Sequence, residues 1–308
     1  MVDDSKSQDD SKLVADGLPQ SESVGRREFM TGMAGAIVSL DERALAGLSG
    51  GARSASAVPS YPTPEKFLET RRDAEAGLRA DPDNARLLGL LAHVLVGDVL
   101  NGWNGAGKGE VERAEIAARK ALKLDDRTVL AHFALGYVHR LHGNHAAALD
   151  SFNEAIRIDP GFARPYAQAA NALVFLGRPN EALPVVEKAL QLSPNDKAIG
   201  VFLWVKGRAY FTLGKYPEAI EPLASSVGVR PNLWYVHAWL VAALALTDRD
   251  AEAQQALNVF KQVHHARADL GWIADYYKEE QYQNPTLQAA SAEVLKGLRR
   301  AGLEAKLA

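Results

Sequence analysis

The residues best suited to metal chemistry are the histidines, which gather in two places along this chain of 308 residues. His139, His142 and His145 recur every three residues, and His264 and His265 form a second group. Imidazole nitrogens are common ligands of zinc and related ions, so the first group could in principle hold a metal. No Asp or Glu completes that group at helical spacing, however. We therefore expect neither a metal nor a cofactor.

Motifs that mark catalytic sites are missing from the sequence. It contains no G-x-S-x-G and no H-E-x-x-H. The glycine-rich stretch at 105–110 has the wrong spacing for a phosphate-binding loop, and no strand pattern precedes it. Glu279 and Glu280 are adjacent, so they would point apart on a helix. There is no cysteine, which excludes disulfides and thiolate catalysis. The sequence predicts a protein that is not an enzyme.

Charge argues against two classes of partner. Nine of the 38 acidic and six of the 35 basic residues lie in residues 1–57, which leaves 29 of each sign in residues 58–308. Nucleic acids and anionic membranes are bound by basic surfaces, which this balanced remainder does not supply. A hydrophobic content of 47% is ample for a core, and helix-forming residues dominate after Tyr61. We expect an all-α protein with a protein or peptide as its partner.

One stretch of sequence, residues 129–162, shows how the helices are organised. Its small and apolar residues follow the spacing W-x2-L-G-x2-Y, A-x3-F-x2-A, P, with histidines in the aromatic slots: His132, Leu135, Gly136, His139, Ala148, Phe152, Ala155 and Pro160. This spacing resembles a tetratricopeptide repeat (TPR). Gly136 would let a second helix approach closely, with Ala148 and Ala155 at the crossing. One such helical hairpin cannot bury its apolar face alone, so neighbours are required.

The neighbouring windows repeat the pattern. Pro160 is followed by Pro194 after 34 residues and by Pro231 after a further 37. The last window has lost its loop glycine, which is replaced by Asp248. We predict a TPR superhelical solenoid over 65–308. Its repeats would span about 83–128, 129–162, 163–196, 197–233 and 234–267, with capping helices at 65–80 and 268–302.

The first repeat carries an insertion. Pro82 lies 44 residues before Asp126, so ten residues are added to the period of 34. We place them between the two helices of this repeat, in a glycine-rich loop that would expose Trp103. Deleting residues from Asn104 to Gly109 would then have little effect on stability, because loop entropy changes slowly with length.

The first 57 residues resemble an export signal. Arg26 and Arg27 form a pair that resembles the twin-arginine motif, and an apolar run from Met30 to Leu40 follows. Those 11 residues are too few to span a bilayer, so we expect no stable membrane insertion. We predict a leader at 1–57, a linker at 58–64 and a periplasmic location in a bacterium. The other interpretation is a disordered tail on a cytoplasmic protein.

Beyond a generic TPR, residues 64–305 are similar to the C-terminal TPR module of bacterial adenylate cyclase-like proteins and winged-helix regulators. The matching stretches are Gly102-Trp103, the helix at 112–126, AHFALG at 131–136 and GLRRAGL at 297–303. The catalytic and DNA-binding domains of those families have no counterpart in the first 63 residues. The resemblance therefore implies a detached interaction module (adaptor or scaffold) without activity. An alternative is an accessory subunit of an exported enzyme complex that contains a cofactor.

Helical geometry places the candidate binding residues on the first helix of each repeat, which lines the concave groove of a TPR stack. The aromatic and polar residues at these positions are Tyr137, Arg140, Arg164, Asn171, Trp204 and Arg208. Asn171 between two arginines resembles the residues by which TPR co-chaperones clamp a peptide carboxylate, although the full five-residue clamp does not match. The aromatic residues could instead pack neighbouring helices. The sequence contains no pattern that specifies an oligomeric state.

Overall fold

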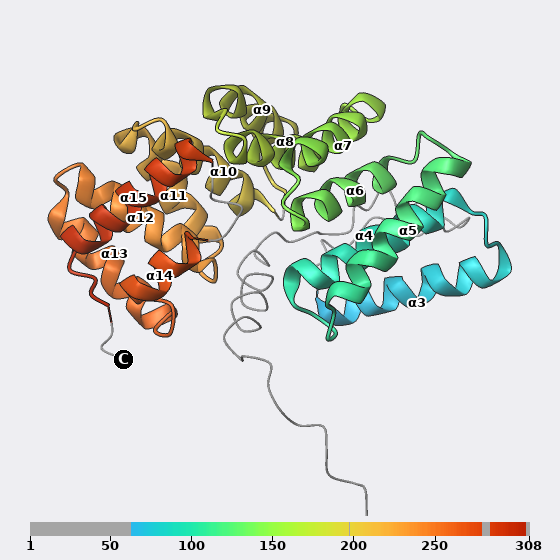
Figure 1. Ribbon diagram of the computed structural model, residues 1–308, viewed down its shortest axis with the longest axis horizontal. Helices are drawn as coiled ribbons and strands as arrows, with labels where there is room; N and C mark the ends of the chain where they lie inside the picture. The colour runs from blue at the N-terminus through green and yellow to red at the C-terminus, as the bar shows by residue number, and fades with distance from the viewer. Residues whose placement is uncertain (1–62, 197, 279–283, 306–308) are drawn as a thin grey trace, which may run out of the picture.

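The computed structural model describes residues 63–196, 198–278 and 284–305, and all regular structure within them is α-helical. The predicted leader and linker therefore lie outside the described residues, except for Thr63 and Pro64. The helices stack into an arch (Figure 1). The structure is an all-α solenoid, as the sequence predicts.

Five antiparallel hairpins form the arch. Their helices are α4 (Ala85–Asn101) with α5 (Lys108–Leu124), α6 (Val129–Leu141) with α7 (His145–Ile158), α8 (Ala163–Phe175) with α9 (Pro179–Leu192), α10 (Ile199–Thr212) with α11 (Tyr216–Val229), and α12 (Trp234–Leu246) with α13 (Asp250–Val263). An additional helix, α3 (Pro64–Ala80), packs against α4. Two further helices, α14 (Leu270–Tyr276) and α15 (Pro285–Arg300), follow the last hairpin.

Short polar loops set the ends of the paired helices. The side chain of Asn144 accepts a hydrogen bond from the Ala147 amide and so caps α7. Gly143, just before it, has φ +75°, a left-handed conformation that glycine adopts at low cost. Asp248 takes the same conformation in the last hairpin, with φ +59°. Asp248 thus replaces the loop glycine and keeps the same backbone conformation, because Asp is among the residues that tolerate the left-handed region.

The aromatic slot of the repeat has a local hydrogen-bonding role. In three hairpins its side chain contacts the backbone carbonyl six residues earlier: His132 with Asp126 at 2.9 Å, Tyr166 with Pro160 at 3.2 Å, and His237 with Pro231 at 2.9 Å. A carbonyl oxygen only accepts, so the histidine Nε2 atoms donate. Histidine replaces the usual aromatic residue here because a ring with a donor at its tip meets the same requirement.

The insertion in the first hairpin does not form a loop alone. Compared with α6 and α7, α4 is longer by four residues and α5 by three, and the loop between them has six residues instead of three. The expectation that Trp103 is exposed is wrong. Its ring packs edge-on against Phe67 of α3, with centroids 5.2 Å apart. Asn104 donates to Asp98 at 2.9 Å and to the Pro64 carbonyl at 3.3 Å, so the loop fastens α3 to the first hairpin.

The C-terminal helices do not simply extend the stack. The sequence predicts that the last helix caps the final repeat. Helix α15 packs mainly on α12, the first helix of that repeat, and also on α10, the first helix of the repeat before it (Figure 1). A Cβ added to Gly297 would lie 2.6 Å from the Ala242 α-carbon, so the two helices are in backbone contact. The chain therefore folds back over its own first-helix face, because Gly297 has no side chain and Ala242 has only a methyl group to hold the helices apart.

Candidate functional site

Three of the predicted binding residues form one cluster. The Arg208 guanidinium donates from Nη1 to the Asn171 side chain at 3.1 Å. Its Cζ lies 4.0 Å from the centroid of the Phe175 ring and 5.7 Å from that of Trp204. Trp204 in turn packs on Trp239 with centroids 5.3 Å apart. An arginine stacked on aromatic faces keeps its charge while most of its surface is removed from water.

A histidine completes this cluster from the other side. The His145 ring stacks on Phe175, with centroids 4.3 Å apart and planes 3° apart. Burial, reinforced by the positive charges of Arg140 and Arg208, lowers the pKa of His145 to about 4. His145 is therefore neutral at pH 7 and serves as an aromatic layer of the core.

Tyr137 and Arg140 form a second pair, on α6. The Arg140 Cζ lies 4.9 Å from the Tyr137 ring centroid, and its Nη1 donates to the Gln168 side chain at 3.0 Å. The other two guanidinium nitrogens of Arg140, Nε and Nη2, are buried and have no hydrogen-bond partner among the described residues. Burial raises the pKa of Tyr137 to about 12, so its hydroxyl remains protonated.

The remaining predicted residue, Arg164, forms a separate ion pair. Its Nε lies 3.3 Å from a carboxylate oxygen of Asp196, in the segment before α10. That carboxylate also accepts the Ala198 amide at 2.6 Å. Both charged side chains are largely buried, so this pair also holds the third and fourth hairpins together.

The expectation that these six residues line an exposed groove is wrong. The exposed fractions are 2% for Tyr137, 4% for Arg140, 5% for Asn171, 7% for Trp204 and 2% for Arg208, and 12% for the side chain of Arg164. The structure brings Asn171, Trp204 and Arg208 together. Sequence reasoning considered His145 only as a possible metal ligand, and it did not single out Gln168 or Trp239. The Asn144 cap was the signal for His145, since it places that residue at the start of a helix.

The three histidines of the first group do not converge. His139 is half-buried, His142 is exposed, and His145 is buried against Phe175. Within residues 63–196, 198–278 and 284–305, no three side chains of metal-binding type are placed to share an ion. In that same part of the chain, no helix combines the length and apolar character needed to cross a membrane.

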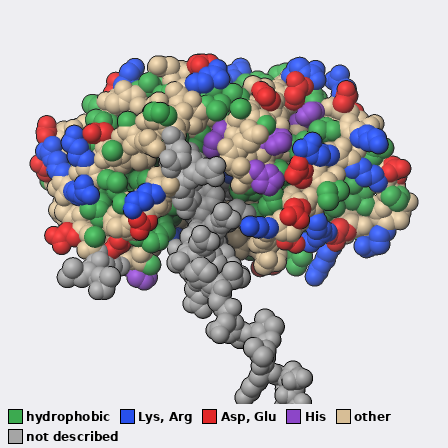
Figure 2. Space-filling view, viewed as in Figure 1, with side chains coloured by type: hydrophobic (Ala, Val, Ile, Leu, Met, Phe, Trp, Pro, Cys, Tyr) green, Lys and Arg blue, Asp and Glu red, His purple; other side chains and the backbone are tan. Residues whose placement is uncertain are grey.

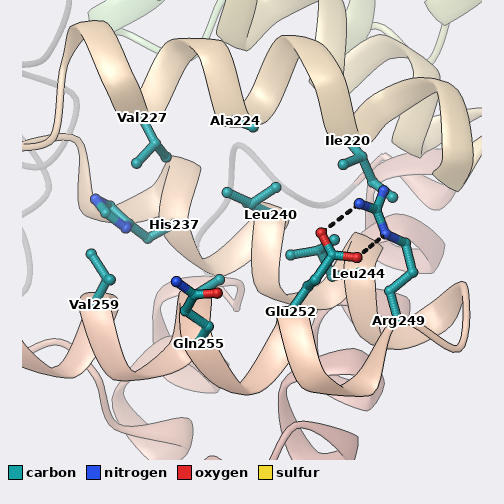
Figure 3. Close-up of a pocket in the computed structure, with 11 residues that line it drawn as sticks. Ile220, Ala224, Val227, His237, Leu240, Leu244, Arg249, Glu252, Gln255 and Val259 are labelled. Carbon is teal, nitrogen blue, oxygen red and sulfur yellow. Dashed lines mark hydrogen bonds and ion pairs between the residues drawn. The ribbon is translucent and has the colours of Figure 1, made fainter.

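A separate apolar groove lies on the other side of the last two hairpins, between α11 and α13 (Figure 3). Leu240 and Leu244 of α12 form its floor, and Val227 of α11 and Val259 of α13 line its two sides. An ion pair between Arg249 and Glu252 closes one end. The groove has a volume of about 310 Å³ and is open to solvent.

The charged side chains on one face of the molecule are of mixed sign (Figure 2). Figure 2 shows Lys and Arg interspersed with Asp and Glu over the face in view. Many of them form pairs within one helix turn, such as Arg178 with Glu181 and Arg249 with Glu252. Exposed pairs of this kind contribute little to stability, and they leave no basic patch on this face.

Comparisons with known families agree with this architecture. Residues 106–161 and residues 140–199 each match a family described as tetratricopeptide repeat. A curated relative, the DnaJ homolog subfamily C member 7 homolog of Schizosaccharomyces pombe, is 29% identical over 166 residues. That match covers 49% of this chain, and the chain spans about a third of the relative, 32% of its length.

Solved structures show the fold over a larger part of the chain. PilF of Pseudomonas aeruginosa superposes with a TM-score of 0.50 at 19% identity, covering 75% of this chain and 92% of that one. Cut9–Hcn1, an APC/C hetero-tetramer, gives a TM-score of 0.55 at 15% identity, covering 78% of this chain and 48% of that one. The chain thus has a TPR solenoid fold.

Proposed function

We propose that this TPR solenoid is a non-catalytic adaptor that binds an extended, acidic segment of a partner protein along the face formed by α6, α8 and α10. TPR proteins are generally non-catalytic, and their repeats form protein-interaction surfaces. The proposal concerns which residues this chain uses. The observation that carries it is the state of Arg140.

Arg140 carries a charge that the described residues do not compensate. Burial lowers its pKa, and the groups that act on it electrostatically are Tyr137, Tyr235, Arg208 and Tyr276, none of which is a carboxylate. Among the described residues, its guanidinium hydrogen-bonds to the neutral side chain of Gln168, and Nε and Nη2 have no partner. A buried cation without a counter-charge is costly. A partner that supplied a carboxylate would remove that cost.

The geometry of the unpaired groups indicates which ligand fits. Nε and Nη2 are the two nitrogens on one edge of the guanidinium, and their N–H groups point in parallel. A carboxylate accepts such a pair through both of its oxygens. Nearby, the half-buried ring of Tyr235, which packs on Trp204 with centroids 5.0 Å apart, offers rigid aromatic area for apolar side chains of the same segment. Both features favour a peptide with acidic and apolar residues.

The test is selection from a library of random twelve-residue peptides displayed on phage, followed by titration of a selected peptide. We expect enrichment of Asp and Glu in the peptides bound by the wild-type chain. Arg140→Lys keeps the charge but loses the paired donors, so affinity should fall by about ten- to a hundredfold. Lys188→Arg on the outer helix α9 is the control. If selected peptides lack acidic residues and bind Arg140→Lys equally well, the proposal is wrong.

Location is a second proposal, based on Arg26 and Arg27, which lie outside the described residues. We propose export of the chain through the twin-arginine route. Replacing both arginines by lysine should retain the protein in the cytoplasm, and unchanged fractionation would contradict the proposal. The alternative of an accessory subunit of a cofactor-containing complex depends on this leader alone. Stoichiometric metal or chromophore in the purified protein would favour that alternative.

A further inference from the structure

We propose that α14 and α15 together form an intramolecular cover of the partner-binding face, with α15 as a fixed strap and α14 as the element that a partner segment displaces. This inference rests on the proposed function, because it concerns regulation of the same site. It is carried by the contacts of the two helices.

The strap α15 reaches three successive hairpin loops. At its start, Asn284 and Thr286 lie against Gly177, where an added Cβ would be 2.6 Å and 3.0 Å from their side-chain oxygens. In its middle, the carboxylate of Glu293 lies near the hydroxyl of Tyr216, after the next loop, so that burial and this negative charge together raise the pKa of Tyr216. At its end, Arg300 lies 2.6 Å from Asp248 and 3.1 Å from Asp250, in and after the last loop. One helix thus joins the third, fourth and fifth hairpins.

The spacing of these contacts along α15 matches the distance between neighbouring helices of the stack. Thr286, Glu293 and Arg300 are seven residues apart, which is about 10 Å along a helix and close to two full turns. Packed helices lie about 8–10 Å apart, so each contact meets one hairpin. The three side chains share one side of α15, while Gly297 lies against Ala242 of α12. Helix α15 therefore holds the last three hairpins at a fixed distance from one another.

The short helix α14 lies over the aromatic cluster of the site. Trp272 and Tyr276 pack edge-on against Trp234, with centroid distances of 4.8 Å and 4.9 Å. The Tyr277 hydroxyl accepts a hydrogen bond from Trp239 Nε1 at 2.8 Å. Trp239 is the ring that packs on Trp204 and lies 5.8 Å from the Arg208 guanidinium.

These contacts place α14 against Trp234 and Trp239 of α12, and Trp239 is the ring that packs on Trp204. Helix α14 has seven residues, which is too short to be stable without its docking contacts. Short segments can open locally at a lower free energy than the whole fold, and such segments supply the moving parts of binding sites. Helix α15, with 16 residues and three loop contacts, stays in place and keeps α14 tethered beside the face it covers.

A matched pair of substitutions in α15 tests the cover. In Gly297→Ala, the new Cβ would lie 2.6 Å from the Ala242 α-carbon, which displaces the strap. Lys296→Ala, one residue earlier, removes only an exposed pair with Glu293. The measurements are amide hydrogen exchange of the full chain and titration with the acidic twelve-residue peptide selected on the wild type.

We expect peptide binding to the wild type to raise exchange in residues 270–277, because α14 is displaced. Gly297→Ala should raise exchange across 270–300, leave α4–α7 protected, and bind the peptide about three- to tenfold more tightly. Lys296→Ala should match the wild type. If Gly297→Ala unfolds the chain, Arg300→Gln is the second variant. It removes the ion pairs of α15 with Asp248 and Asp250 and so detaches only the end of the strap.

The cover proposal is wrong if Gly297→Ala and Arg300→Gln bind the peptide with the affinity of the wild type and if peptide binding does not change amide exchange in residues 270–277. Absence of peptide binding to every variant, including those whose α14 exchanges freely, would instead overturn the proposed function. The two failures are therefore distinguishable.

Discussion

Gly136 of α6 and Phe152 of α7 are in such close contact that a Cβ on Gly136 would lie 2.3 Å from Cε1 of the phenylalanine ring. The ring occupies the space where any other residue at 136 would place its side chain. Ala148 and Ala155, on either side of Phe152 along α7, are fully buried. The sequence prediction of a close crossing at Gly136 is confirmed. The helices approach closely because the Phe152 ring, one helical turn from both Ala148 and Ala155, fills the space above Gly136.

Gly136→Ala should therefore destabilise the fold. The methyl group forces the Phe152 ring to move within a close-packed hairpin, which costs about 1–3 kcal/mol. Chemical denaturation would show a lower midpoint with an unchanged slope. The control is Gly109→Ala in α5, where an added Cβ meets nothing within 4 Å. That change should be neutral or slightly stabilising, and an equal loss in both variants would contradict the packing argument.

The helices were predictable because each repeat carries its own local signals. Gly136 and Gly207 mark crossings, and a Cβ on Gly207 would lie 2.6 Å from Leu223. Prolines and loop residues mark the ends of the helices. These signals act over a few residues, so a 34-residue period in the sequence becomes one hairpin per period in the structure.

The fold-back of α14 and α15 could not be predicted in the same way. Its contacts join residues far apart in the chain, such as Tyr277 with Trp239 and Arg300 with Asp248. An amphipathic pattern shows that α15 has an apolar side but not which helix covers it. The candidate site was consequently predicted as exposed, although Asn171 and Arg208 are buried and joined by a hydrogen bond.

Trp103→Ala should loosen α3. The Trp103 ring packs on Phe67, which is fully buried between α3 and the first hairpin. Losing that partly buried aromatic contact should cost about 1–3 kcal/mol. Hydrogen exchange should rise mainly in residues 64–80. Lys108→Ala, an exposed change in the same connection, should leave exchange there unaltered. Deleting 104–109 should also destabilise the protein, because it removes Asn104.

Trp204→Ala should destabilise the whole C-terminal half. A groove residue exposed to solvent would leave the melting temperature near that of the wild type, but Trp204 is buried against Tyr235 and Trp239. Replacing a buried aromatic residue by alanine costs about 3–5 kcal/mol. Trp204→Phe keeps part of the packing and should recover part of that loss. Unchanged denaturation midpoints for Trp204→Ala would show that the ring is not part of the core.

His145 should make stability depend on pH. Its pKa is about 4 in the folded chain, below its ordinary value of 6.5, so the unfolded chain binds more protons between those pH values. The free energy of unfolding therefore rises with pH across this window: the contribution is complete above pH 6.5 and is lost as pH falls toward 4. The full effect is on the order of 3 kcal/mol.

The measurement is urea denaturation from pH 4 to 7. Burial also lowers the pKa values of His237 and His264, so they add to the slope with the same sign. His145→Phe keeps a ring against Phe175 but cannot take up a proton, and it should reduce the slope. His142→Gln changes an exposed histidine and should leave this slope unchanged. If the slope is the same in His145→Phe as in the wild type, protonation of His145 does not oppose folding.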